Sequence, residues 1–201
     1  MRSALFVGVL GLLGACGDDG GSSTIDASTD GPTTDGGIDA AIDAPAGVFA
    51  LTSPTITEGG AIPLTHVCTQ RGGMNLSPQL AWTGAPAGTM SFVVMLTDTT
   101  NGLVHSGTYD IPGTLTGLPA DVDKVYAPLD VPGAHQPISY VAGARGYNGP
   151  CPQVVHTYQF KIYALSTAAL PGATMATTRP QVVTAAGTNL GTATLTATFT
   201  P

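Results

Sequence analysis

Seven short segments in which apolar residues mostly alternate with polar ones or threonine dominate the last three quarters of the chain. Such alternation is the pattern of a β-strand with one buried face. Turn sequences such as EGGAIP, TGAPAG and NGPCP separate the segments. The predicted strands are 48–52, 80–82, 91–97, 104–111, 125–127, 157–165 and 192–200. The pattern predicts a mainly β fold built as a sandwich-like pair of sheets.

Two of the segments add detail to this fold. SFVVMLT, residues 91–97, is almost entirely apolar and predicts a central strand that is covered on both faces. A helix is predicted over 180–190, because Pro180 stands at its start and Gly191 follows its end. We therefore expect a β-sandwich with one or two small helices.

The first 16 residues read as an export signal. Arg2 precedes an apolar stretch that reaches Leu13, and small residues lead to Cys16, a pattern too short for a spanning helix. The LGAC ending resembles that of a bacterial lipoprotein signal, which makes Cys16 the lipidated first residue of the mature chain. The alternative is an ordinary signal peptide that is cleaved nearby and leaves a free thiol. We favour lipidation, because an unpaired thiol is a liability in an oxidising compartment.

Residues 17–46 separate this signal from the strand-rich part. They contain seven Asp, no Lys or Arg and no aromatic residue, and the rest is mostly Gly, Ser, Thr, Ala and Pro. Such a segment cannot bury enough apolar surface to offset its ordering entropy, so it predicts a disordered acidic tether. The predicted domains are the signal 1–16, the tether 17–46 and a folded domain 47–201. The expected location is a bacterial cell envelope, with the outer membrane favoured.

The charge of the folded domain excludes one class of function. The tether alone accounts for the formal net charge of −7, and residues 47–201 carry six acidic and five basic side chains. Nucleic-acid binding needs clustered Lys and Arg to displace counterions from phosphates, and no such cluster is present in the sequence. We expect no nucleic-acid partner.

Two cysteines, Cys68 and Cys151, remain in the folded domain. Cys151 lies five residues before His156, so a thiolate activated by that His is one hypothesis. The other is a Cys68–Cys151 disulfide. It is favoured because cysteines of exported domains normally oxidise and because Pro residues on both sides of Cys151 suit a rigid loop.

Two motifs resemble the phosphatidylethanolamine-binding proteins, in particular the bacterial branch called Raf-kinase-inhibitor-like. The first is NLSP, 75–78, followed by LAW, 80–82. The second is GPCP, 149–152, followed by His156 and Tyr158. The likeness runs in order from Phe49 to the last predicted strand.

This resemblance implies a β-sandwich with a small pocket for a phosphate-like anion or a phospholipid headgroup at one end of a sheet. Carried over position by position, the implied ligand-binding residues are Asp98, His105, Gly149, Pro150, His156 and Tyr158. Imidazole and phenol groups can donate hydrogen bonds to an oxyanion, and a carboxylate can orient a His.

The chain departs from the family pattern around this pocket. The family's Pro-Asp-x-Pro is replaced after Asp98 by Thr99, Thr100 and Asn101, and its two tryptophans correspond to Leu103 and Ser106. The sheet should persist while the ligand preference changes.

The expected function is a non-catalytic, membrane-tethered binding protein without cofactor or metal. No Ser elbow, carboxylate pair or His pair at a short metal-ligand spacing occurs in the sequence. The alternative is a protein-interaction or inhibitor module, directed at a kinase or protease partner of unknown identity, with a degenerate pocket. His66 and His135 are expected at the surface or in local hydrogen bonds, and Arg71 and Arg145 near the pocket mouth.

Overall fold

The computed structural model describes residues 47–201, and the predicted signal and tether lie outside the described residues. The strands are β1 (Ala50–Thr52), β2 (Leu80–Thr83), β3 (Ser91–Asp98), β4 (Val104–Pro112), β5 (Gly117–Leu118), β6 (His156–Leu165) and β7 (Gly191–Phe199). Two single-turn 3-10 helices, Leu64–His66 and Thr69–Arg71, and the helix α1 (Arg179–Ala185) complete this part of the chain. None of its helices has the length and apolar character needed to cross a bilayer.

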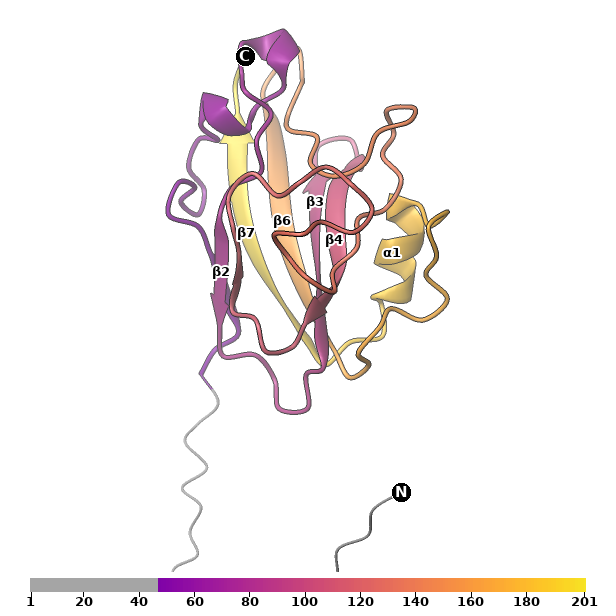
Figure 1. Ribbon diagram of the computed structural model, residues 1–201. Helices are drawn as coiled ribbons and strands as arrows, with labels where there is room; N and C mark the ends of the chain where they lie inside the picture. The colour runs from indigo at the N-terminus through magenta and orange to yellow at the C-terminus, as the bar shows by residue number, and fades with distance from the viewer. Residues whose placement is uncertain (1–46) are drawn as a thin grey trace, which may run out of the picture. The chain divides into compact units, whose positions relative to one another are not determined.

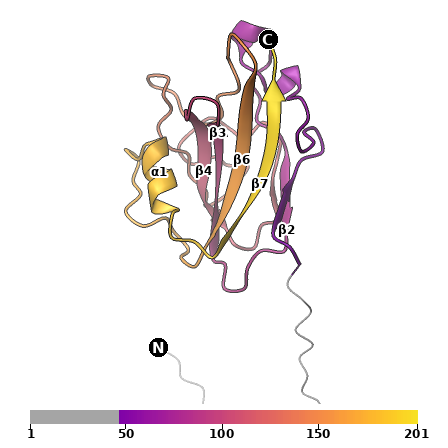
Figure 2. The ribbon, with the colours of Figure 1, turned by 180° about the vertical axis from the view of Figure 1, so that it is seen from behind.

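The strands form two sheets, as the sequence predicts. The larger sheet has the order β4-β3-β6-β7 and the smaller one the order β1-β2-β5, and all paired strands are antiparallel. Figures 1 and 2 show the smaller sheet on one side of the larger sheet and α1 beside β4. The mainly β sandwich with few helices is confirmed.

The central strand β3 shows how the sequence builds two cores. Phe92 and Val94 point into the core between the sheets, where the Phe92 ring lies 5.1 Å from the ring of Trp82 on β2. Val93 and Met95 point the other way, into a second apolar cluster that includes Val182 of α1 and its neighbours. All six residues from Ser91 to Leu96 are buried, so the prediction of a strand covered on both faces is confirmed.

Two local predictions were wrong. Residues 125–127 form no strand, because Val125 closes a tight turn by donating its amide hydrogen to the Asp123 carbonyl and stays half exposed. The helix starts where expected, with the Thr178 amide donating to the Gln181 side chain, but it ends at Ala185 instead of 190. The Asn189 side chain donates to the Ala186 carbonyl, which caps this early end.

A candidate ligand-binding recess

Three strand termini lie together at one end of the larger sheet and form a recess. Because the strands are antiparallel, the end of β3, the start of β4 and the start of β6 lie together. The recess has a volume of about 210 Å³. It is lined by Asp98, Asn101, Leu103, His105, Tyr140, Cys151, Pro152, His156 and Tyr158. The four polar side chains that the family resemblance selects, at 98, 105, 156 and 158, therefore converge on one recess.

Asp98 is the buried anchor of this recess. One carboxylate oxygen lies 2.5 Å from Nδ1 of His156, and the other accepts the amide hydrogen of Thr100 at 2.9 Å. Only 2% of the Asp98 side chain is exposed, against 16% for His156. Asp98 therefore lies behind the imidazole and fixes its orientation, and Nδ1 of His156 carries a hydrogen.

A β-bulge places His105 in the recess. Leu96 pairs with Ser106 and Thr97 with Val104, so His105 is an extra residue on β4 without a partner on β3. A bulge of this kind redirects a side chain at the end of a ladder. The His105 ring meets the rings of Tyr158 and Tyr140 edge-on, with centroids 5.4 and 5.6 Å away.

Burial dominates the electrostatics of His105. It lowers the pKa of the imidazole below its ordinary value, and the carbonyl of Asn148 and the charge of Asp98 only partly offset this effect. The Arg179 guanidinium lowers the His105 pKa further. Nδ1 of His105 lies 3.1 Å from the Asn148 carbonyl oxygen.

Tyr158 forms a wall of the recess and interacts with Asp98. The side chain is buried on β6 directly opposite Asp98 in the β3–β6 ladder. Burial raises the pKa of the phenol well above its usual range, and the charge of Asp98 raises it further. The phenol therefore stays protonated.

The loop that carries Gly149 and Pro150 shapes the recess through its backbone. Neither residue lines the hollow, whereas Cys151 and Pro152 do. The Gly149 amide donates to the Asn75 side chain at 2.8 Å, and the Pro150 carbonyl accepts from the Cys68 amide at 3.0 Å. These two residues position the loop and present no contact surface of their own to the hollow.

A disulfide joins Cys68 to Cys151, as predicted, with the Cα atoms 5.4 Å apart. The bond excludes Cys151 as a thiolate nucleophile in this state, because neither sulfur is free. It links the start of the second 3-10 turn to the wall of the recess.

Tyr140 and Arg179 were not predicted as members of the site. Tyr140 lines the recess from an irregular loop, and the Arg179 guanidinium lies 4.7 Å from the centre of its ring. Arg179 also donates to the backbone carbonyls of Val104 and Ile138. Tyr140 supplies an aromatic wall of the recess. Arg179 supplies a positive charge that acts on His105.

The shortened turn after Asp98 is well connected. The Thr99 amide donates to the Thr157 carbonyl, and the Thr157 amide donates to the Thr100 hydroxyl, both at 2.9 Å. Gly102, with a φ of 79°, allows the chain to reverse into β4. The turn that replaces the family's Pro-rich segment therefore ties β3 directly to the start of β6.

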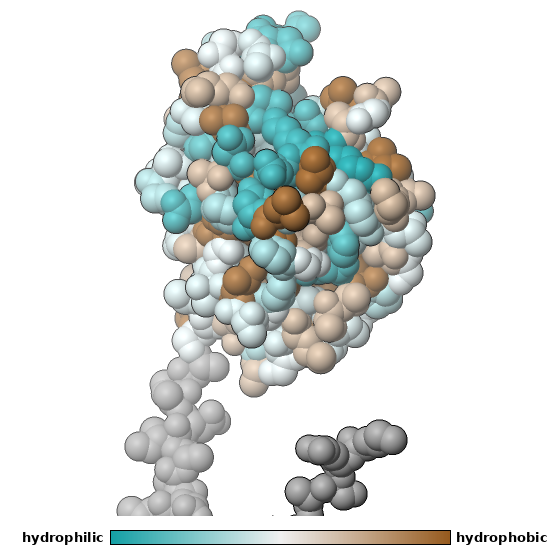
Figure 3. All heavy atoms as spheres, in the orientation of Figure 1, coloured by the Kyte–Doolittle hydropathy of each residue, from teal (hydrophilic) through white to brown (hydrophobic). Residues whose placement is uncertain are grey.

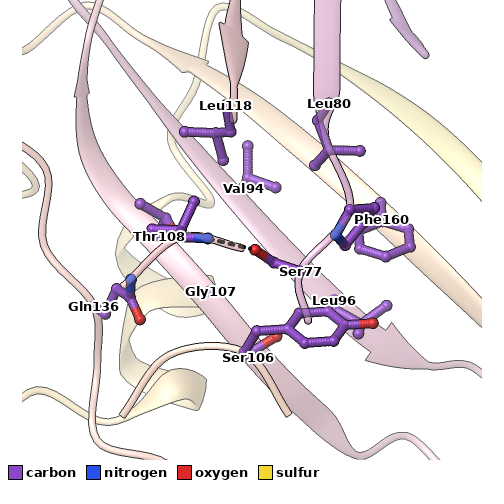
Figure 4. A pocket seen from close by; sticks show the side chains of 13 residues that line it. Ser77, Leu80, Val94, Leu96, Ser106, Gly107, Thr108, Leu118, Gln136 and Phe160 are labelled. Atoms are coloured by element: carbon purple, nitrogen blue, oxygen red, sulfur yellow. Dashed lines mark hydrogen bonds between the residues drawn. The ribbon is translucent and has the colours of Figure 1, made fainter. Parts of the chain in front are cut away.

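Three other hollows in residues 47–201 are lined by no His, Lys or Arg. One of them, beside α1, has no ionisable side chain in its lining. A cavity of about 40 Å³ lies between the two sheets (Figure 4). Leu96 and Phe160 of the larger sheet and Leu80 of the smaller sheet line it. It has room for two or three water molecules at roughly 10–15 Å³ each. A larger groove beside β1 and β7 carries a single ionisable side chain, Glu58. Of these four hollows in the described part of the chain, the recess alone combines His, Asp and Tyr.

The remaining His and Arg residues lie outside the recess. His66 is buried and hydrogen-bonds the Thr55 hydroxyl and the Leu76 carbonyl, both at 2.9 Å, so of its two expected roles the structure shows local hydrogen bonding. His135 pairs with Asp110 at 2.9 Å. Arg145 stacks on Tyr126, and neither it nor Arg71 lines the recess. Within 47–201 no cluster of three His, Cys, Asp or Glu side chains could hold a metal ion.

The fold and the recess together define a β-sandwich with a small polar hollow at one end of its larger sheet. The model of the phosphatidylethanolamine-binding protein family matches residues 52–200, and the chain therefore belongs to this family.

Among its relatives, the UPF0098 protein YbcL of Escherichia coli is 37% identical over 137 residues, which cover 64% of this chain and 74% of YbcL. A UPF0098 protein of Aquifex aeolicus is 35% identical over 135 residues, or 63% and 75% of the two chains. The crystal structure of E. coli YbcL matches with a TM-score of 0.68 at 34% identity, covering 76% of this chain and 98% of that one. A Chlamydia trachomatis homologue of the family, CT736, matches with a TM-score of 0.62 at 26% identity, covering 76% and 97%.

Proposed function

We propose that the domain binds a phosphate-like oxyanion, free or as part of a phospholipid headgroup, in the recess at one end of the larger sheet. The binding is non-catalytic. The observation that carries the proposal is the pair of imidazoles, His105 and His156, that line one hollow while a buried carboxylate fixes one of them. The chain acts in a bacterial envelope, held to the membrane by a lipid on Cys16.

The charges around the recess support an anionic ligand. The Asp98 carboxylate lines the hollow but is almost fully buried, and His156 and Thr100 each occupy one of its oxygens. When the His156 ring is protonated, both of its nitrogens donate, so Nε2 can donate to a ligand oxygen while Nδ1 holds Asp98. Arg179 adds positive charge close enough to act on His105.

The experiment is calorimetric titration of the purified protein with inorganic phosphate and with phosphoethanolamine. We expect binding that His156→Ala abolishes, because the substitution removes the donor and leaves the Asp98 charge facing the ligand. The chain offers a matched control in its second Asp–His pair, since His135 with Asp110 lies outside the recess. His135→Ala should leave the affinity unchanged. Equal loss in both variants, or no binding to the parent protein, contradicts the proposal.

A second candidate function is docking of a protein partner at the rim. Val154 and Val155, directly before His156, are 65% and 56% exposed, and Val141 near Tyr140 is 45% exposed. On the face shown in Figure 3, however, apolar residues lie in separate groups among polar ones. This candidate gains support only if no anion binds.

A further inference from the structure

The hydrogen bond of His105 decides which of its nitrogens can donate to a ligand. Nδ1 lies 3.1 Å from the carbonyl oxygen of Asn148, and a carbonyl only accepts, so Nδ1 carries the hydrogen. In the neutral ring, Nε2 is then an acceptor. Among the described residues Nε2 has no hydrogen-bond partner, and the ring lines the recess. The recess therefore offers a ligand an acceptor from His105.

The carbonyl that selects this tautomer is firmly held. The Asn148 side chain donates to the Ser139 hydroxyl at 2.6 Å, and the next amide, that of Gly149, donates to the Asn75 side chain at 2.8 Å. Asn75 has a φ of 57°, a left-handed conformation that Asn tolerates better than most residues. The arrangement fixes the tautomer of His105 before any ligand arrives.

Burial favours the neutral form of the His105 ring. The ionisable groups around it are Asp98 on β3, His156 and Tyr158 on β6, Tyr140 on its loop and Arg179 at the start of α1. Burial is the main reason that the pKa of His105 lies below its ordinary value, and Arg179 acts in the same direction. Asp98 opposes them, but its carboxylate is already used by His156 and Thr100.

We propose that the recess selects a phosphate that carries a protonated oxygen, that is, inorganic phosphate or a phosphomonoester monoanion, over a phosphodiester. This inference rests on the proposed anion-binding function. The P–OH group donates to Nε2 of His105, and a charged oxygen of the same phosphate accepts from Nε2 of His156, which donates when that ring is protonated. A phosphodiester has no P–OH group, so it leaves the His105 acceptor unpaired. The phosphate of a phospholipid headgroup is such a diester.

The experiment is calorimetric titration of the purified protein with methyl phosphate and dimethyl phosphate at about pH 6, near the second pKa of a phosphomonoester. About half of the methyl phosphate is then a monoanion with one P–OH group, whereas dimethyl phosphate is a monoanion without one. We expect methyl phosphate to bind roughly 5- to 150-fold more tightly, which is the range that corresponds to leaving a desolvated acceptor unpaired. Its affinity should fall at higher pH, as the P–OH group ionises.

The possible outcomes separate the two proposals. Equal affinity for the two esters overturns this inference and leaves the anion site standing. Binding of neither ester overturns both. The variant His105→Leu removes the acceptor, so it should reduce the preference for methyl phosphate. If that variant does not fold, the affinities of the parent protein for the two esters still test the inference.

Discussion

Replacing both Cys68 and Cys151 by Ala removes the covalent link between two residues that are 83 positions apart in the chain. In the chain-entropy model, a loop of this size lowers the entropy of the unfolded state enough to stabilise the fold by about 4.6 kcal/mol. The figure is an upper value. The loop is also held by the Gly149–Asn75 and Cys68–Pro150 hydrogen bonds, which do not involve the sulfur atoms. The double variant should therefore fold but unfold at much lower urea concentration.

The assay is equilibrium urea unfolding of the oxidised protein, the reduced protein and the double variant. The reduced protein and the double variant should show a similar loss in the free energy of unfolding, because both lack the cross-link. A loss below about 1 kcal/mol would refute the reasoning, since the loop-closure term alone is several times larger. If the double variant is far less stable than the reduced protein, the loss of stability comes from lost packing around Cys68.

Three further predictions follow from the recess and the chain's start. Asp98→Asn should lower the free energy of unfolding by about 1.5–3 kcal/mol, because it removes the charged acceptor of the His156 hydrogen bond. Urea unfolding measures this loss, and an unchanged free energy of unfolding contradicts the role of Asp98 as anchor. The folded state lowers the pKa of His105, so the unfolded chain binds the proton first as the pH falls below about 6.5, and stability drops from there downward. His105→Gln should flatten that drop in urea unfolding at several pH values, and an unchanged profile excludes His105 as its source. Cys16→Ser should release the protein from the membrane fraction of expressing cells, and an unchanged distribution rules out lipidation.

Much of the sandwich is readable from local patterns. The apolar run 91–97 was enough to place β3 at the centre of the larger sheet, because only a strand covered on both faces buries so many consecutive side chains. Short elements escaped this logic. The two residues of β5 are too few for a period, and 125–127 has a strand-like composition in a segment that turns.

The recess was harder to foresee. The family resemblance selects Asp98, His105, His156 and Tyr158, and the structure brings them together, but their ligand role stays a prediction. The bulge at His105 depends on the register between two strands, which no single strand's sequence specifies. Tyr140 and the carbonyl of Asn148 come from irregular loops, where side-chain and backbone positions follow from tertiary contacts alone.

The most direct test of the central claim is a phosphate titration followed by NMR of the histidine ring nitrogens. The folded domain carries four histidines, two at the recess and two outside it. Our account predicts that the signals of His105 and His156 shift together with one dissociation constant, while those of His66 and His135 stay in place. Signals that do not move at the recess, or that move only at His66 or His135, would contradict it.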